Sequence, residues 1–214
     1  MGKVIKYKLG SDYREKVSRK QRYLSKLYCF PIIGNFFKDY LKKVYGLDNS
    51  VSIIPGFHCE SVNLKVGTAT SLANLYIHGT GPVEIGNNSN FSRGCKIITG
   101  SHDLDDFSVA IIKPTVINDY VWVSRDSTIL QGVTIGRGAV IGAKSVVRSN
   151  IPPYAIVYGN PCKVVGFRYN PEEAARFEEK HIREEDRIPM DVLQKNYNKY
   201  FTNRIKEIKR FVEI

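Results

Sequence analysis

Residues 115–147 read TVINDYVWVSRDSTILQGVTIGRGAVIGAKSVV, and an aliphatic side chain returns at every sixth position of this stretch. The aliphatic positions are Ile117, Val123, Ile129, Ile135, Ile141 and Val147. Two positions before each of them stands a mostly small or β-branched residue: Thr115, Val121, Ser127, Val133, Ala139 and Ser145. A period of six matches neither the repeat of a helix nor the simple alternation of a strand.

A period of six fits a short strand followed by a corner, repeated so that one side chain per repeat points to a common axis. Three hexads form a triangular coil of about 18 residues, and stacked coils lie about 4.8 Å apart. Glycines such as Gly136 and Gly142 relieve backbone crowding at the corners. Because β-branched residues and glycines disfavour a helix, and a meander would not keep one phase through six repeats, the stretch predicts a parallel β-helix.

Upstream the repeat is less regular. Ile54, Val66 and Leu72 are predicted to point inward, and the phase is regular again from Ile85. Between Leu72 and Ile85 lie thirteen positions where two hexads need twelve, which predicts a bulge or short insertion near residues 78–81.

The chain divides into three segments. Residues 51–168 are expected to form about six coils, interrupted once by a loop at 103–113, and a loop that leaves a regular solenoid suggests a use. Residues 1–50 and 169–214 are expected to be helical extensions. Helical patterns are predicted at residues 12–28, 32–44, 171–186 and 191–212, and residues 1–10 are expected to be irregular. The C-terminal helices are expected to cap the open end of the ladder.

Bulk composition indicates a soluble globular protein of one domain, with 43% apolar and 25% charged residues in 214. The sequence shows no signal-peptide pattern and no apolar stretch long enough for a bilayer, so a cytoplasmic location is expected. The net charge of +11 is compatible with nucleic acid, anionic lipid or a polyphosphate ligand. The absence of a nucleic-acid-binding motif argues against nucleic acid as the partner. Basic and aromatic residues interleave at 32–44, which leaves peripheral membrane contact as an alternative. Cys29, Cys59, Cys95 and Cys162 form no metal-binding spacing and predict reduced thiols.

The end of the repeat, NIPPYAIVYGNPCKVVGFR at residues 150–168, carries a family resemblance together with Trp122, Val123 and the Ile-Gly repeats. It resembles the hexapeptide-repeat acyltransferases, in particular the branch of maltose/galactoside and xenobiotic O-acetyltransferases. The resemblance covers roughly residues 51–168. It implies a left-handed β-helix, acetyl-CoA as co-substrate without a metal, and a homotrimer whose active sites lie between neighbouring prisms. For the helix predicted at residues 32–44, packing against a neighbouring subunit is therefore preferred to contact with a membrane.

His102 stands where the repeat breaks, at the mouth of loop 103–113. A lone histidine is more often structural, but His102, Leu104 and Asp105 are similar to the H-x-L-D pattern of the family's active-site histidine. The resemblance implies a general base, and a neutral imidazole can take the proton of a hydroxyl that attacks a thioester. No Cys or Ser lies in a recognisable nucleophile-and-base arrangement, which favours direct transfer. In the family, a backbone N–H from the coil around residues 122–125 stabilises the oxyanion.

For coenzyme A, the resemblance carries over a set of positions on the last coils: Trp122, Ser124, Arg125, Gly142, Ala143, Arg148, Ser149, Lys163 and Arg168. Arg125 and Ala143 are expected beside the pantetheine arm. Arg148, Lys163 and Arg168 are expected near the phosphates, because guanidinium and ammonium groups pair with phosphate. Each of these residues is equally compatible with a structural or surface role.

Two positions depart from the family pattern. Ser124 stands where relatives have Gly, which places a side chain close to the thioester, and Ser149 replaces a Lys, although neighbouring Arg148 keeps a charge. For the acceptor, Asn74 roughly matches a sugar-contacting Asn of the relatives. Asp105 is expected either to bind a sugar hydroxyl or to orient His102.

These observations favour an acetyl-CoA-dependent O-acetyltransferase that acts on a sugar hydroxyl in cell-surface polysaccharide biosynthesis. An N-acyltransferase acting on an amino sugar and an antibiotic-modifying acetyltransferase are alternatives, because both acceptors need the same base. A metal enzyme like the γ-type carbonic anhydrases is a remote alternative, since it needs three converging histidines. A non-catalytic scaffold is the third reading.

Overall fold

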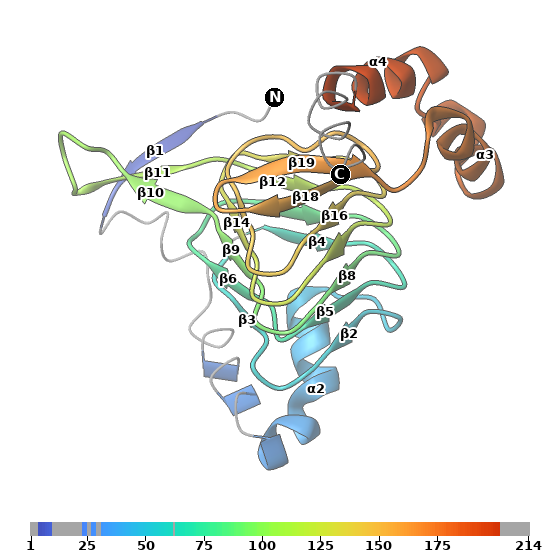
Figure 1. Ribbon diagram of the computed structural model, residues 1–214. Coiled ribbons are helices and arrows are strands. Elements are labelled where there is room, and N and C mark those ends of the chain that lie inside the picture. Colours follow the sequence, from blue (N-terminus) through green and yellow to red (C-terminus); the bar gives the residue numbers. More distant parts are fainter. Residues whose placement is uncertain (1–3, 10–22, 25–26, 29–30, 62, 202–214) are drawn as a thin grey trace, which may run out of the picture.

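The computed structural model describes residues 4–9, 23–24, 27–28, 31–61 and 63–201, with backbone only for residues 31–35. The hexads form a three-sided prism of parallel strands, seen from the side in Figure 1. Its first face stacks β2 (Ser52–Ile53), β5 (Ser71–Ala73), β8 (Asn90–Phe91), β13 (Trp122–Val123), β16 (Val140–Ile141) and β18 (Ala155–Gly159), with β19 (Cys162–Phe167) antiparallel at the end. The second face stacks β3 (His58–Cys59), β6 (Tyr76–His78), β9 (Lys96–Ile98), β14 (Thr128–Leu130) and β17 (Val146–Val147). The third face stacks β4 (Leu64–Val66), β7 (Val83–Ile85), β12 (Thr115–Ile117) and β15 (Thr134–Ile135).

The six-residue phase fixes the core, because residues one coil apart pair directly. Ile97, Ile129 and Val147 stand above one another on the second face, and each is 0% exposed. Stacking brings the aliphatic side chains into continuous ladders whose burial drives folding. The prediction for Ile54 was wrong by one position: Ile53 is buried instead, because the pairing of β2 with β5 shifts register after Ser52.

The two predicted irregularities have different structures. The first is an insertion between β6 and β7, where Ile77 and Ile85 point inward eight positions apart instead of six. The second is a hairpin, formed by β10 (Gly100–His102) and β11 (Val109–Ile112), that leaves the corner between the second and third faces.

A strand near the N-terminus completes this arm. β1 (Ile5–Lys8) pairs antiparallel with β11, so a strand is formed within residues 1–10, where irregular structure was expected. The projecting three-stranded arm is therefore built from residues about 100 positions apart, and Figure 1 shows it reaching away from the prism. We call it the β1–β10–β11 arm.

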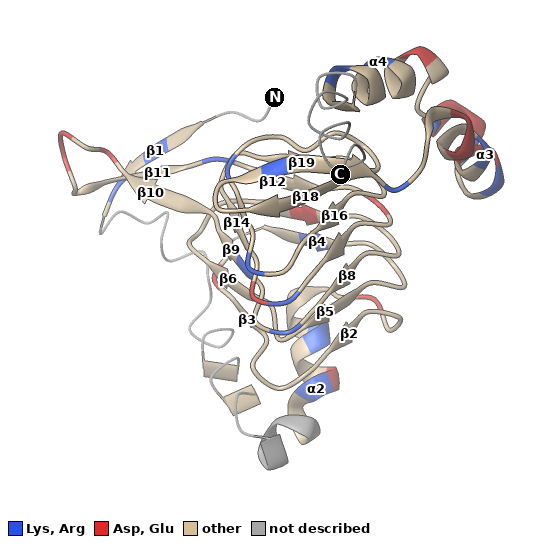
Figure 2. Ribbon diagram, in the orientation of Figure 1, with Lys and Arg blue, Asp and Glu red and all other residues tan. Residues whose placement is uncertain are grey.

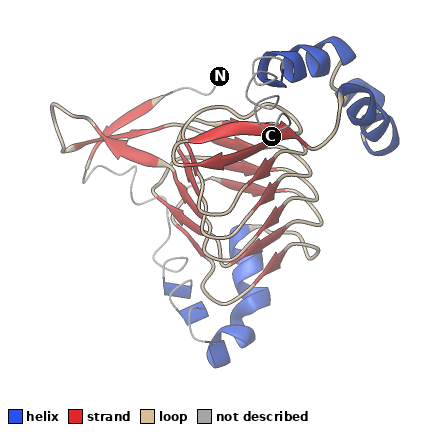
Figure 3. Cartoon of the chain, in the orientation of Figure 1, coloured by secondary structure: helices blue, strands red, loops and turns tan. Residues whose placement is uncertain are grey.

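Helices lie outside the three faces, as Figure 3 shows. α2 (Pro31–Tyr45) closes the N-terminal end, where Leu41 and Tyr45 join the core cluster. Of the helix predicted at residues 12–28, residues 23–24 and 27–28 are helical, and the rest lies outside the described residues. The end of the helix predicted at residues 191–212, from residue 202 on, also lies outside them. No helix in the described ranges is long and apolar enough to cross a bilayer.

The C-terminal segment forms α3 (Pro171–His181), a 3₁₀ turn η2 (Glu184–Asp186) and α4 (Met190–Phe201). Asn170 and Glu173 form a capping box that fixes the start of α3. These helices pack beside the last coils rather than across the ladder, and the ladder's end is covered by β19 through Cys162, Val164 and Phe167. The expected helical cap is thus replaced by an antiparallel strand.

Candidate active site

His102 is the last residue of β10, two positions out along the arm from Gly100 and next to the turn at the tip. The turn beyond it is ordered by local hydrogen bonds: the Asp103 carboxylate accepts from the Asp105 N–H at 3.1 Å, and Lys6 of β1 binds Asp103 at 2.7 Å. This ion pair with Lys6 lowers the pKa of Asp103. The acidic tip of the arm stands out in Figure 2. His102 is thus exposed and lies on a braced hairpin, not on a loose loop.

The His102 ring is oriented by the backbone. Its Nδ1 lies 2.9 Å from the carbonyl oxygen of Phe107, across the turn. A carbonyl only accepts hydrogen bonds, so Nδ1 carries the hydrogen and the neutral ring keeps its lone pair on Nε2. The sequence offered Asp105 as one option for orienting this ring; in the structure the group that contacts Nδ1 is the Phe107 carbonyl.

A cavity of about 220 Å³ lies next to His102. Its walls come from the arm, the insertion after β6 and the residue after β3: Tyr7, Leu9, Glu60, His78, Gly79, Thr80, Gly100, Ser101, His102, Ala110 and Ile112. Tyr7 and Thr80 share a hydrogen bond of 2.8 Å, which ties β1 to the insertion. We call this space the His102 cavity.

Most of the residues predicted to bind coenzyme A fall on two corners of the prism. Arg125 and Ala143 are exposed on consecutive coils at the corner between the first and second faces, where the Lys144 N–H donates to the Arg125 carbonyl. Lys163 lies at the same corner, at the start of β19 opposite Tyr158. Arg148 and Ser149 follow β17 and are exposed at the other corner, between the second and third faces.

That other corner is the one from which the arm leaves. One coil above the arm, Gln131 donates a 2.6 Å hydrogen bond from Nε2 to the hydroxyl of Ser101. Arg148 stands one further coil along, because β14 pairs with β17. His102, Gln131 and Arg148 therefore mark successive levels of one edge.

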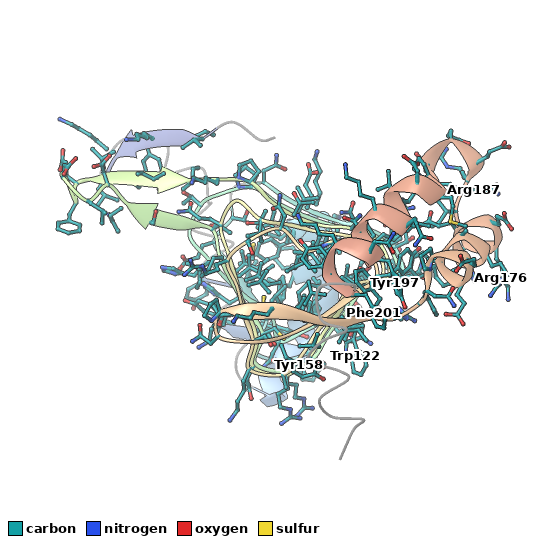
Figure 4. The ribbon with its side chains drawn as sticks, turned by 45° about the horizontal axis from the view of Figure 1, so that its top comes forward. Trp122, Tyr158, Arg176, Arg187, Tyr197 and Phe201 are labelled. Atoms are coloured by element: carbon teal, nitrogen blue, oxygen red, sulfur yellow. The ribbon has the colours of Figure 1, made fainter. Side chains whose placement is uncertain are left out.

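Trp122 and Arg168 lie on the first face instead. They line a groove of about 520 Å³ with Tyr158, and the labelled rings of Trp122 and Tyr158 appear together in Figure 4. Both rings are 51% exposed. The Tyr158 ring covers Gly142, where an added Cβ would stand 2.1 Å from the ring, so any larger residue would displace the Tyr158 side chain.

Of the two departures, Ser124 has clear structural partners, and so does the predicted acceptor residue Asn74. The Ser124 N–H donates to Ile141 at 2.9 Å, and its carbonyl accepts from the Cys95 thiol at 3.2 Å. The Asn74 side-chain oxygen accepts from the Gly94 N–H at 2.9 Å, at the corner between the first and second faces. Within one chain, Asn74 is therefore engaged in a corner contact and does not line the His102 cavity.

Comparison with known proteins agrees with this geometry. Residues 114–149 match the family model of the bacterial transferase hexapeptide (six repeats). A maltose O-acetyltransferase from Clostridium difficile superposes with a TM-score of 0.69 at 26% identity, covering 78% of this chain and 94% of that one. The chain therefore carries the hexapeptide repeat of bacterial transferases and shares its left-handed β-helical fold with hexapeptide-repeat acetyltransferases.

Two further relatives bear on the reaction. A hexapeptide-repeat acetyltransferase from Vibrio cholerae, solved in complex with acetyl coenzyme A, has a TM-score of 0.63 and 27% identity over 73% of this chain and 87% of that one. A chloramphenicol acetyltransferase from Klebsiella aerogenes is 46% identical over 59 residues, which is 28% of each chain. The matches span only 28% to 33% of the length of the first curated relatives.

Thiol chemistry is disfavoured in this hexapeptide-repeat chain. Burial raises the pKa of Cys59 to about 12 and that of Cys95 to about 11, and burial also raises the pKa of Cys162. A nucleophilic cysteine needs a lowered pKa, so none of these three is activated. Cys29 lies outside the described residues. Within the described ranges, no group of three or more His, Cys, Asp or Glu is arranged to hold a metal ion.

Sequence reasoning missed several residues of the cavity. Tyr7 could not be found, because its place depends on a strand that pairs across about 100 residues. The Phe107 carbonyl left no sequence signal, since any residue supplies one. Glu60 did leave a signal, as a charged residue that is out of phase with the hexads.

Proposed function

We propose that this chain transfers the acetyl group of acetyl-CoA directly to a hydroxyl of a small acceptor, with His102 as general base. The observation that carries the proposal is the His102 ring itself: Nδ1 is bound to the Phe107 carbonyl at 2.9 Å and the ring borders a cavity. A fixed tautomer with a lone pair on Nε2 is what a base needs before substrate binds.

The reaction then proceeds in two proton-balanced steps. His102 Nε2 accepts the hydroxyl proton while the hydroxyl oxygen bonds to the thioester carbonyl carbon, which gives a tetrahedral oxyanion. The carbon–sulfur bond breaks as the oxyanion collapses, and the thiolate of CoA takes the proton back from the imidazolium. The backbone of the coil at residues 122–125 is the source of the N–H that binds the oxyanion.

Acetyl-CoA supplies the activated acyl group, and exposed basic residues near both corners suit its phosphates. Arg148 lies on the edge that carries His102, whereas Arg125 and Lys163 lie on the opposite edge of the second face. Trp122 lies beyond that edge on the first face. A single coenzyme A site that uses residues from both edges is completed most simply between two copies of the chain. This supports a homotrimer with active sites shared between subunits.

The acceptor we propose is a saccharide of a cell-surface polysaccharide, modified in the cytoplasm. The similarity to a maltose O-acetyltransferase supports a sugar hydroxyl. The similarity to chloramphenicol acetyltransferases supports a second acceptor class, an antibiotic hydroxyl. An acceptor panel that contains mono- and disaccharides, amino sugars and chloramphenicol separates these options.

The test is release of CoA from acetyl-CoA in the presence of each acceptor, measured with a thiol reagent. We expect His102→Ala to lower kcat by about 10²- to 10⁴-fold, the usual contribution of a general base. His181→Ala is the matched control, because His181 is an exposed histidine on α3 away from the cavity. Equal rates for wild type and His102→Ala would remove His102 from the mechanism.

A further inference from the structure

Glu60 joins two histidines next to the His102 cavity. Its Oε1 lies 3.4 Å from His58 Nε2, and its Oε2 lies 3.0 Å from His78 Nδ1. The N–H of Gly79 also donates to Oε2 at 3.0 Å. The mechanism proposed above gives this cluster no role, although Glu60 stands out in the sequence as a charged residue that breaks the hexad pattern.

The carboxylate of Glu60 is ionised throughout the physiological range. The hydrogen bond with His58, helped by the Gly79 N–H and His78, lowers the pKa of Glu60 to about 2 in spite of partial burial. The ionised Glu60 oxygen faces His78 Nδ1 at 3.0 Å and disfavours a lone pair there, so the neutral form of the His78 ring carries its hydrogen on Nδ1 and its lone pair on Nε2.

His78 therefore repeats the arrangement of His102. In both rings Nδ1 faces a fixed oxygen: Glu60 at an ion-pair distance of 3.0 Å in one case, and the Phe107 carbonyl as a hydrogen-bond acceptor in the other. Both rings line the His102 cavity, and the His78 side chain is 56% exposed. Neither Nε2 atom receives a hydrogen bond from a side chain or backbone group in the part of the chain that the structure describes.

The Nε2 atoms of His78 and His102 are two hydrogen-bond acceptors beside one small cavity, and a ligand with two donor groups would satisfy both. We propose that the His102 cavity selects an acceptor with two neighbouring hydroxyl groups, as on a sugar ring. His102 takes the proton of the hydroxyl that reacts, and His78 accepts a hydrogen bond from the adjacent hydroxyl. This inference rests on the proposed acetyl transfer and adds a specificity-determining residue to it.

The size and surroundings of the cavity agree with such an acceptor. Its volume of about 220 Å³ is below the roughly 300–1,000 Å³ of sites for drug-sized ligands, so it suits a single ring. Tyr76 holds the cluster in place, because its ring stacks on His58 at 4.7 Å and lies parallel to His78 at 6.2 Å. The orientation of His78 is therefore set before the acceptor binds.

The experiment compares a methyl pyranoside that the wild type acetylates with its deoxy derivative lacking only the hydroxyl next to the acetylated one. We expect the wild-type kcat/KM to favour the diol by about 5- to 10-fold, the usual worth of one hydrogen bond. In His78→Phe, which keeps a flat ring beside Tyr76 but removes both nitrogens, the ratio should fall to about 1. His181→Phe is the matched control and should keep the wild-type ratio.

The ratio separates specificity from general damage, because a folding defect lowers both rates alike. If His78→Phe keeps the wild-type preference for the diol, or if the wild type shows none, the inference is overturned while acetyl transfer stands. If the wild type releases no CoA with any acceptor, the proposed function itself fails. Calorimetric binding of CoA to His78→Phe, expected to match the wild type, confirms that the loss is confined to the acceptor.

Discussion

Replacing Glu178 should release the C-terminal helices from the prism. The Glu178 side chain of α3 is 2% exposed, and it accepts hydrogen bonds from the Arg137 guanidinium and the Tyr154 hydroxyl. Arg137 and Tyr154 sit on successive coils at the corner between the third and first faces, where the Tyr154 N–H binds the Arg137 carbonyl. Glu178 is thus the polar link between α3 and the last two coils.

The magnitude follows from what Glu178→Ala would leave behind. The Arg137 side chain is 14% exposed and would lose its close counter-ion, since Asp119 lies 3.9 Å from its Nε. The Tyr154 hydroxyl would lose its acceptor inside the protein. Removing one partner of a buried ion pair costs about 3–5 kcal/mol of the free energy of unfolding. Glu178→Gln keeps an oxygen for one donor and should cost less, about 1–3 kcal/mol.

Urea unfolding at one fixed protein concentration measures this change, with the fluorescence of Trp122, the single tryptophan, as reporter. With a slope of about 3 kcal/mol per molar urea, the midpoint of Glu178→Ala should fall by about 1–1.7 M. Hydrogen exchange should speed up first in α3. Glu179→Ala, an exposed neighbour on the same helix, should stay within about 0.5 kcal/mol. A Glu178→Ala protein as stable as this control would refute the reasoning.

Three further predictions concern the ladder, a glycine and pH. Ile129→Ala, in the middle of the second-face ladder and 0% exposed, should lower the free energy of unfolding by about 2–5 kcal/mol in urea titration, whereas Thr128→Ala on the outer side of the same strand should cost far less. Gly81→Ala should destabilise the insertion after β6, because the new Cβ would stand 2.5 Å from the Thr99 carbonyl oxygen; a wild-type melting temperature would contradict this. The folded-state pKa of Glu60 is lowered from 4.5 to about 2, so its contribution to stability is complete above pH 4.5 and is lost as the pH falls toward 2. Thermal melts between pH 5 and 2.5 should therefore show a smaller loss for Glu60→Gln than for wild type.

The prism could be predicted from sequence because each hexad places its aliphatic residue by local geometry alone. Ile129 and Val147 are eighteen positions apart, which is three hexads, and Ile97 still pairs with Ile129 although the arm lengthens the chain between them to 32 positions. Phase alone does not locate a bulge, which is why Ile54 was chosen in place of Ile53.

The candidate site was only partly predictable, because its groups meet through non-local pairing. His102 was marked by the break in the repeat, but its orientation comes from the carbonyl of Phe107 across a turn. Tyr7 enters through β1, which no local pattern connects to β11. Asn74, chosen by family resemblance, binds the Gly94 N–H instead. Backbone contacts and long-range strands carry no signature in the identity of single residues.

The architecture explains why the proposed general base lies on the arm and not inside the prism. Side chains that point into the prism are committed to an aliphatic ladder, and a buried imidazole there would need a partner that the ladder does not supply. Leaving the prism costs the parallel hydrogen bonds of one corner, but the pairing of β10 with β11, and of β11 with β1, replaces them. His102 is therefore outside the core yet held on a hydrogen-bonded sheet, which gives a base both access to the acceptor and a fixed orientation. Shortening the arm to an ordinary hexad corner should preserve the ladder and remove the candidate site, so the prism and the proposed function are separable in this chain at residues 100–112.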